Sequence, residues 1–257
     1  MFNPSDFANI VRTEESFWWF RGMRGISFAL LDPWIRQVGV RRVLDAGCGT
    51  GHFAAMLRGR YGAEVVAIDL EWEGIRNCRG RGTVQPVQAS MSALPFPNGA
   101  FDLVTNMDVL VHFPAGQEGP PFAELVRVVR PGGLLLLRVA ALPIFRSRHS
   151  VFTWERQRFT RQRLAGLAHA NTLEILRLTY ANFLLSPVAF VKFRLWEPLT
   201  RRPPASGLIP LPRWLDHLLY APLALERLWL ARGGGLPWGQ SLYLLARKRW
   251  RAVPAKG

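Results

Sequence analysis

The segment from Val43 to Phe53 constrains the fold more than any other part of this chain. It reads Val-Leu-Asp-Ala-Gly-Cys-Gly-Thr-Gly-His-Phe, so an apolar run leads into a turn with a glycine at every second position. A helical pattern follows, with Phe53, Met56 and Leu57 on one face. Glycines let the backbone pass close beneath a ligand, and the start of a helix directs its N–H groups at a negative group. The segment therefore predicts a strand, a ligand-binding loop and a helix, which together open a βαβ unit.

The spacing of the glycines separates the ligand classes. The dinucleotide-binding fingerprint needs its third small residue at position 52, where this chain has His52, and the Gly-Lys-Ser/Thr of a phosphate-binding loop is absent. What remains is Asp45 with glycines at 47, 49 and 51, followed by Asp69 at the end of a second apolar run. This pattern resembles motif I of the class I, Rossmann-like S-adenosylmethionine-dependent methyltransferases. The resemblance implies that the loop wraps the methionine part of this cofactor and that Asp69 holds the ribose hydroxyls. The alternative is a glycine turn in an ordinary α/β protein.

Strands and helices alternate regularly after residue 41, which predicts a parallel sheet with right-handed crossovers and ligands at the carboxyl ends of its strands. The last strand resembles the antiparallel seventh strand of the same family. We therefore expect an α/β fold with a Rossmann-like, seven-stranded, mostly parallel sheet, a helical N-terminal segment and a helical insertion before the last strand. The predicted strands are 42–46, 64–69, 84–88, 101–106, 134–139, 173–180 and 241–247, and the predicted helices include 5–37, 51–60, 72–80, 120–130 and 160–170.

A second stretch strengthens the resemblance. Leu94-Pro95-Phe96, a short turn and Phe101-Asp102 are similar to the motif II region of the broad type 11 group, and Arg130-Pro131-Gly132-Gly133 before a strand is also typical of it, so the resemblance covers residues 41–140. In that group an aspartate usually stands where this chain has Ser90 and receives the adenine amino group; a serine hydroxyl accepts a weaker hydrogen bond. The resemblance assigns cofactor contacts to Asp45, Ala46, Gly47, Cys48, Gly49, Gly51, Asp69, Leu70, Ser90, Met91, Asn106, Met107 and Asp108.

Three regions are expected from the pattern. Residues 1–40 form a helical lid, residues 41–182 and 240–250 form the methyltransferase core, and residues 183–239 form a helical cap. The lid carries the aromatic run 17–20, which covers more than one helix face and so packs on a neighbouring surface. Trp19, Arg24 and Tyr180 are the expected substrate contacts, Arg24 by pairing with a carboxylate. The alternative is that the aromatic side chains only fasten the helix to the core.

Methyl transfer from a sulfonium is an in-line displacement, so the protein mainly aligns an acceptor lone pair and excludes water. An oxygen or nitrogen acceptor can need a base, and His112 and His149 are the expected candidates. A histidine that packs or caps a loop is the alternative for His112. No Cys/His set has the spacing of metal ligands, so we expect no metal.

Composition bears on the partners. The formal net charge is +15, and lysine occurs only at Lys192, Lys248 and Lys256, so arginine supplies nearly all the positive charge. The arginines are scattered, which places an anionic membrane surface or an acidic substrate ahead of nucleic acid. The two cysteines, the absence of a signal-peptide pattern and the absence of an apolar run of about 20 residues indicate a cytoplasmic protein.

The segment 183–239 is rich in Leu, Trp and Pro, and its helical pattern has a wide apolar face with basic flanks. Such a face suits peripheral contact with a membrane, or a cap packed on the core or on a second copy. The expected activity is methyl transfer to an O or N atom of a small-molecule or lipid-like acceptor, with S-adenosylmethionine as cofactor. A nucleic-acid methyltransferase and a non-catalytic cofactor-binding protein are the alternatives.

Overall fold

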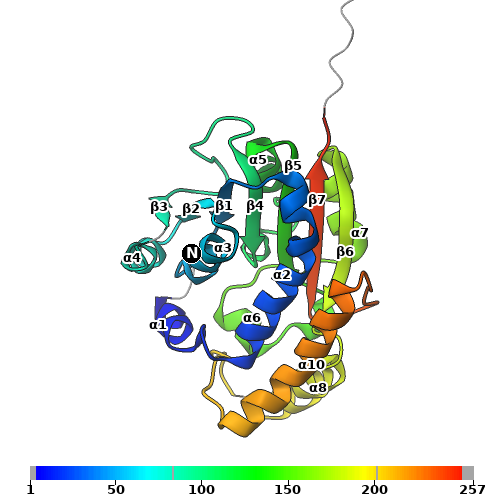
Figure 1. Cartoon of the computed structure of the whole chain (residues 1–257). Helices are drawn as coiled ribbons and strands as arrows, with labels where there is room; N and C mark the ends of the chain where they lie inside the picture. Colours follow the sequence, from blue (N-terminus) through cyan, green and yellow to red (C-terminus); the bar gives the residue numbers. More distant parts are fainter. Residues whose placement is uncertain (1–3, 83, 201, 251–257) are drawn as a thin grey trace, which may run out of the picture.

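The computed structural model of the chain describes residues 4–82, 84–200 and 202–250 (Figure 1). Its core is one seven-stranded sheet with helices on both faces. The strands are β1 (Arg42–Ala46), β2 (Glu64–Asp69), β3 (Gln85–Gln88), β4 (Phe101–Met107), β5 (Val129–Ala140), β6 (Leu173–Ala181) and β7 (Ser241–Lys248). The helices of the N-terminal segment and core are α1 (Pro4–Thr13), α2 (Trp18–Val38), α3 (His52–Tyr61), α4 (Trp72–Gly80), α5 (Gly119–Val128), α6 (Arg148–Phe152) and α7 (Arg161–Ala170), with short 3-10 turns η1 (Leu110–His112) and η2 (Pro143–Phe145).

The strand order is β3-β2-β1-β4-β5-β7-β6. The pairs β1–β2, β1–β4, β2–β3 and β4–β5 are parallel, whereas β7 runs antiparallel to both β5 and β6. The expected sheet with an antiparallel last strand is therefore confirmed. Because the chain reverses direction in sheet order between β1 and β4, the carboxyl ends of these two strands flank the switch point where ligands bind in such sheets. In Figure 1 these ends point toward α6, α8 and α10.

Apolar strands account for the core. The strands β4, β5 and β7 are buried along most of their length, and Leu134, Leu135, Leu136 and Leu137 of β5 are fully buried. In Figure 1, α2 and α3 lie in front of the sheet, and α5 and α7 lie behind it. Both faces of the central strands are therefore covered, which is why they read as continuous apolar runs rather than as alternating ones.

Two predicted elements differ from the structure. The helix expected over 5–37 is two helices, because the chain leaves the helical path over residues 14–17 and Glu14 turns toward the glycine loop. The helix expected to reach Arg130 ends at Val128, and β5 begins at Val129 instead of Leu134. Val129 pairs with Phe101 of β4, so strand pairing takes these residues away from the helix.

The insertion is helical and packs on the N-terminal segment. It contains α8 (Ser186–Val191), the π-helical turn η3 (Lys192–Trp196), α9 (Glu197–Thr200) and α10 (Arg213–Ala231). One face of α10 lies against α2: a Cβ atom on Gly22 would come within 2.3 Å of Leu223 Cδ1, so the two helices approach as closely as a glycine allows. Asp216 accepts hydrogen bonds from the Trp18 N–H and from Arg21, both at 2.7 Å. No helix in the described ranges is long and apolar enough to cross a bilayer.

Glu226 anchors the base of the insertion. Its buried carboxylate accepts hydrogen bonds from the Asn182 N–H at 2.7 Å and from the Leu184 N–H at 2.8 Å. Burial raises the pKa of this carboxyl, and the N–H groups partly offset the effect. We expect Glu226→Ala to lower the free energy of unfolding by about 2–4 kcal/mol, because two backbone donors lose their acceptor inside the protein. Urea unfolding measures the change.

Glu174→Ala is the matched control for this substitution. Glu174 is exposed on β6 and only approaches Arg247 at 4.0 Å, so its removal is expected to change the free energy of unfolding by less than about 0.5 kcal/mol. Equal effects of the two substitutions would show that Glu226 has no special role in holding the insertion.

Candidate functional site

The glycine loop connects β1 to α3 at the carboxyl edge of the sheet. The N–H groups of Gly47 and Cys48 both donate to the Ile68 carbonyl at 2.8 Å, which ties the loop to the end of β2. Gly47 has φ of 82°, and a Cβ atom there would lie 2.2 Å from Val109 Cγ2. Only glycine fits this position, both in conformation and in space. The loop therefore presents a bare backbone beside the end of β4.

Asp69 lies where β2 ends and faces the loop. Its carboxylate accepts hydrogen bonds from the Gly49 N–H at 2.8 Å and from the Glu71 N–H at 2.9 Å. Burial raises the pKa of Asp69, and these N–H groups oppose the rise. The two bonds fix the carboxylate oxygens next to the glycine loop.

Asp45 is a buried carboxylate on β1, and no cation of the described residues pairs with it. Only 2% of the residue is exposed, and its oxygen accepts a 2.6 Å hydrogen bond from Thr105 Oγ1. Burial raises its pKa to about 7, and the Thr105 bond lowers it in part. A buried carboxyl of this kind favours a ligand that brings a positive charge.

Asn106 completes the set at the end of β4. Its Nδ2 donates to the Ala46 carbonyl at 2.7 Å and contacts Met91 Sδ at 3.0 Å, while its buried Oδ1 has no hydrogen-bond partner within the described residues. Ser90 Oγ accepts from the Ser92 N–H at 3.2 Å. A buried oxygen without a donor, beside a glycine loop and Asp45, suits a ligand that carries an ammonium group, as S-adenosylmethionine does.

The next cluster lies just beyond β4. Asp108 has a positive φ of 59°, and its carboxylate pairs with Arg138 on β5, with Arg138 Nε at 2.9 Å and Nη2 at 2.5 Å. The Arg138 guanidinium lies 4.9 Å from the centre of the Trp19 ring. Burial lowers the pKa of Arg138, but Asp108 more than reverses this, so the pKa is above its usual value. The expected substrate residue Trp19 is thus placed next to the expected cofactor residue Asp108.

The connection between α1 and α2 is fastened to the glycine loop. The buried Glu14 carboxylate accepts hydrogen bonds from Thr50 Oγ1 and from Arg81 Nη2. Arg24, expected to meet a substrate carboxylate, donates instead to the backbone carbonyls of Glu14 and Glu15. Burial raises the pKa of Glu14, against the Thr50 bond and Arg81. The Glu14 carboxylate therefore fastens the N-terminal segment to the glycine loop.

The two candidate bases lie in different surroundings. His112, in η1, has its Nδ1 atom 3.4 Å from the Trp154 carbonyl, and burial lowers its pKa, although Asp108 partly opposes this. His149, in α6, accepts a 3.0 Å hydrogen bond from the Gly207 N–H of the insertion. Of the two imidazoles, His112 is the one beside Asp108.

Tyr180 lies on β6, two strands away from β5. Its hydroxyl accepts a 3.2 Å hydrogen bond from the Arg161 N–H at the start of α7, and only 5% of the residue is exposed.

Among the described residues, no group of three or more His, Cys, Asp and Glu side chains is arranged to hold a metal ion.

Sequence reasoning missed Arg138 and Glu14. Arg138 carries the only charge in the apolar run 134–139, and an arginine in a buried strand needs a partner, so this signal was available. Glu14 begins an acidic pair in an arginine-rich chain, but its contact with Thr50 depends on the break between α1 and α2 and has no local pattern.

Part of the chain matches known proteins. Residues 43–133 match the family model described as a methyltransferase domain. The fatty-acid O-methyltransferase of Mycolicibacterium smegmatis is 35% identical over 120 residues, 45% of this chain and 41% of that protein. The phthiotriol/phenolphthiotriol dimycocerosates methyltransferase of Mycobacterium leprae is 34% identical over 148 residues, 55% of this chain and 52% of that protein. The chain thus spans about half the length of these curated relatives.

Solved structures share the fold over most of the chain. The geranyl diphosphate C-methyltransferase of Streptomyces coelicolor, solved with S-adenosyl-L-homocysteine, gives a TM-score of 0.55 at 17% identity, covering 85% of this chain and 78% of that one. The [4+2]-cyclase SpnF gives 0.53 at 21% identity, covering 86% and 80%. Residues 43–133, from β1 to the start of β5 and including the glycine loop between Asp45 and Asp69, thus match a methyltransferase domain, and the sheet order agrees with the Rossmann-like fold of the S-adenosylmethionine-dependent methyltransferases.

Proposed function

We propose that the protein transfers a methyl group from S-adenosylmethionine to an O or N atom of a small-molecule or lipid-like acceptor. The main observation behind this proposal is the carboxylate of Asp45, which is buried beside the glycine loop and pairs with no cation of the described residues. Asp69 is held at the neighbouring strand end. The relatives include a fatty-acid O-methyltransferase and a phthiotriol/phenolphthiotriol dimycocerosates methyltransferase, which supports a lipid-like acceptor.

The cofactor supplies an electrophilic methyl group, and the residues of this chain bind, orient and exclude water. Asp69 and the backbone of the glycine loop are the residues that would hold the ribose, and Asp45 would pair with the ammonium group. The aromatic run of α2, with Trp19 stacked on Arg138, forms an apolar wall beside Asp108. This wall keeps water from the acceptor atom. Exclusion of water strengthens the electrostatic interactions inside the site.

His112 is the proposed proton acceptor. A backbone carbonyl only accepts hydrogen bonds, so the contact with the Trp154 oxygen places the ring hydrogen on Nδ1 and makes Nε2 the basic nitrogen. Because burial lowers the pKa of His112, the imidazole is neutral near pH 7 and is able to take a proton from a hydroxyl or amine acceptor. His149 is the second candidate, because its Nδ1 already accepts a hydrogen bond from the Gly207 N–H.

Calorimetric titration tests the cofactor. We expect S-adenosylmethionine and S-adenosylhomocysteine to bind saturably, and NAD and ATP not to bind. Asp69→Ala is expected to weaken both adenosyl ligands by about 10- to 100-fold, the value of a hydrogen bond to a charged group. Glu64→Ala, at the exposed start of the same strand, is the matched control and leaves the affinity unchanged. Folded protein that binds neither adenosyl ligand, or binds NAD equally well, contradicts the proposal.

Transfer of a labelled methyl group then separates the acceptor classes. Long-chain carboxylic acids, phenols and amines form one panel, with short-chain analogues as controls, and RNA and DNA form another. Labelled apolar product supports a lipid-like acceptor, whereas salt-sensitive labelling of nucleic acid supports the alternative that the net charge of +15 favours. Cofactor binding without labelling of any acceptor indicates a non-catalytic protein, and the cyclase SpnF shows that this fold also serves other chemistry.

A further inference from the structure

Helix α10 is apolar on two opposite faces, although only one of them is covered. Its inner face packs on α2 through the buried Leu223 and Leu230. Its outer face follows a helical repeat and is exposed along the whole helix, with Trp214 68% and Leu225 60% exposed. The exposed apolar side chains of α10 are Trp214, Leu218, Leu225, Leu228 and Trp229.

The segment from α8 to α9 exposes a second apolar set at the same end of the molecule. Figure 1 shows α8 beside α10, and Glu226 of α10 binds the backbone just before α8. In this segment Trp196 is 65% and Leu199 is 79% exposed. The exposed members are Val188, Phe190, Val191, Leu195, Trp196 and Leu199. We call this set, together with the five exposed side chains of α10, the apolar end.

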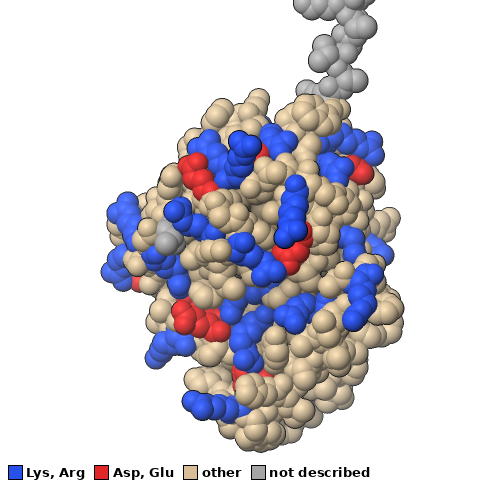
Figure 2. Space-filling view, viewed as in Figure 1, with Lys and Arg blue, Asp and Glu red and all other residues tan. Residues whose placement is uncertain are grey.

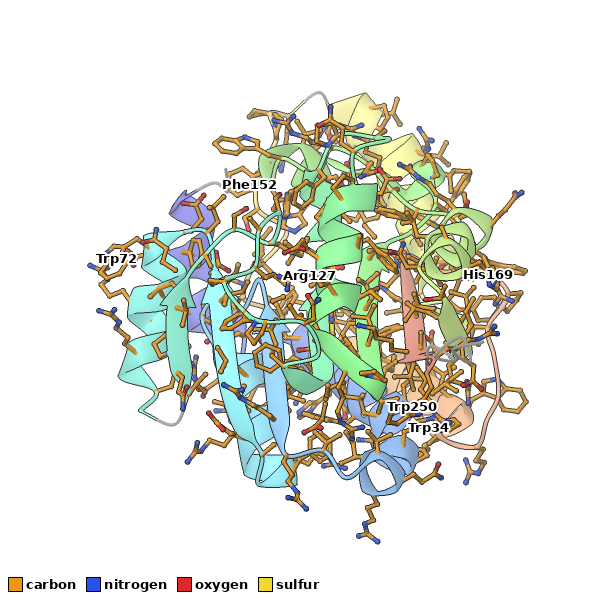
Figure 3. All side chains as sticks on the ribbon, turned by 90° about the horizontal axis from the view of Figure 1, so that it is seen from above. Trp34, Trp72, Arg127, Phe152, His169 and Trp250 are labelled. Atoms are coloured by element: carbon orange, nitrogen blue, oxygen red, sulfur yellow. The ribbon has the colours of Figure 1, made fainter. Side chains whose placement is uncertain are left out.

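The charges around the apolar end are sorted by sign. Every acidic side chain in the described part of 183–239 is turned inward: Glu226 is buried, Asp216 binds Arg21, and Glu197 accepts from the Arg148 N–H at 2.8 Å. Most basic side chains of the same segment are exposed, whereas Arg227 lies against Gly25 of α2. Figure 2 shows a largely uncharged lower end bordered by blue side chains. The exposed basic residues are Lys192, Arg194, Arg202, Arg213 and Arg232.

We propose that the apolar end docks the protein on the surface of an anionic lipid bilayer. Leucines and tryptophans enter the boundary between headgroups and acyl chains, and the surrounding arginines and lysine bind the lipid phosphates. A second copy of the chain fits this surface less well, because a two-fold contact would bring one basic border against the other. No helix in the described residues is suited to cross the bilayer, so the contact is peripheral.

The apolar end also lies on the side of the molecule that holds the site. The carboxyl ends of the parallel strands, where Asp45, Asp69 and Asp108 lie, point toward α6, α8 and α10 in Figure 1. A lipid acceptor lying in the bilayer would therefore approach from the docked side. This second step rests on the proposed function, whereas the docking itself does not.

Vesicle flotation without cofactor or acceptor tests the docking. We expect the protein to float with phosphatidylcholine vesicles that contain phosphatidylglycerol, to float weakly with phosphatidylcholine alone, and to release at high salt. The variant Leu218→Glu/Leu225→Glu is expected to bind at least about tenfold more weakly, because two exposed apolar side chains no longer enter the bilayer. Lys192→Gln and Arg213→Gln are each expected to weaken binding about fivefold, with a smaller salt dependence.

Two tryptophans near helix starts provide a test variant and its matched control. Trp214→Glu, in the first turn of α10, is expected to reduce vesicle binding, whereas Trp72→Glu, at the start of α4 and 50% exposed, is expected to leave it unchanged. Urea unfolding of each variant confirms that it is folded. Equal effects of the two substitutions, no binding of the wild-type protein, or self-association that only the Trp214 variant loses would overturn the proposal. Titration with S-adenosylmethionine on the same samples shows separately whether the proposed function stands.

Discussion

Gly47→Ala is expected to remove measurable binding of S-adenosylmethionine and to lower the free energy of unfolding by about 2–5 kcal/mol. The left-handed backbone at Gly47 costs an L-residue about 1–2 kcal/mol, and a Cβ atom 2.2 Å from Val109 Cγ2 adds about 1–3 kcal/mol of overpacking. Relief of that overlap displaces the Gly47 and Cys48 N–H groups from the Ile68 carbonyl and moves the loop. Urea unfolding and calorimetric titration measure the two effects.

Variants at two further glycines and one double variant separate the backbone cost of Gly47→Ala from the overlap with Val109. Gly49 also has a positive φ, of 54°, but nothing lies within 4 Å of an added Cβ, so Gly49→Ala carries only the backbone cost of about 1–2 kcal/mol. Gly59, in α3, has neither a positive φ nor a close neighbour, and Gly59→Ala is expected to stabilise by up to about 1 kcal/mol. Val109→Ala added to Gly47→Ala is expected to restore part of the lost stability. If Gly49→Ala proves as damaging as Gly47→Ala, the overlap with Val109 is not the cause.

The parts of the fold that local sequence determines were predicted closely. The strands 42–46 and 64–69 have the predicted bounds, because each is an apolar run ended by an aspartate or a glycine turn. The antiparallel last strand is confirmed at Ser241–Lys248. The same patterns put Asp45 and Asp69 at adjacent strand ends, since neighbouring parallel strands end at one edge of a sheet.

Contacts between distant segments were not predictable in this way. The stacking of Arg138 on Trp19 joins residues far apart in the chain, and no local pattern selects that partner. The break at 14–17 was missed because the helical pattern of 5–37 is continuous, whereas Glu14 gains Thr50 and Arg81 only when the chain turns. The covered face of α10 depends in the same way on α2, so the sequence showed a wide apolar face without showing which half is buried.

The affinity for S-adenosylmethionine is expected to rise about tenfold for each pH unit up to pH 7 and to level off above it. Burial raises the pKa of Asp45 to about 7, so below that pH the free protein holds a proton that pairing with the ammonium group must displace. The affinity falls again above about pH 8, where an α-amino group loses its charge. Titration in buffers of different ionisation enthalpy is expected to show proton release below pH 7 and little near pH 7.5.

The same carboxyl links folding to pH with a definite sign. A carboxyl whose folded pKa is raised from 3.8 to about 7 contributes stability that is fully present below pH 3.8 and is lost as the pH rises through 7. Asp45→Asn is expected to remove this loss of stability. It is also expected to flatten the pH profile of S-adenosylmethionine affinity below pH 7 and to weaken binding at pH 7.5. Asp69→Asn is the comparison, because burial also raises the pKa of Asp69 but its oxygens already accept two N–H groups. If the slope below pH 7 survives in Asp45→Asn and disappears in Asp69→Asn, the proton belongs to Asp69, and the ammonium group is not held by Asp45.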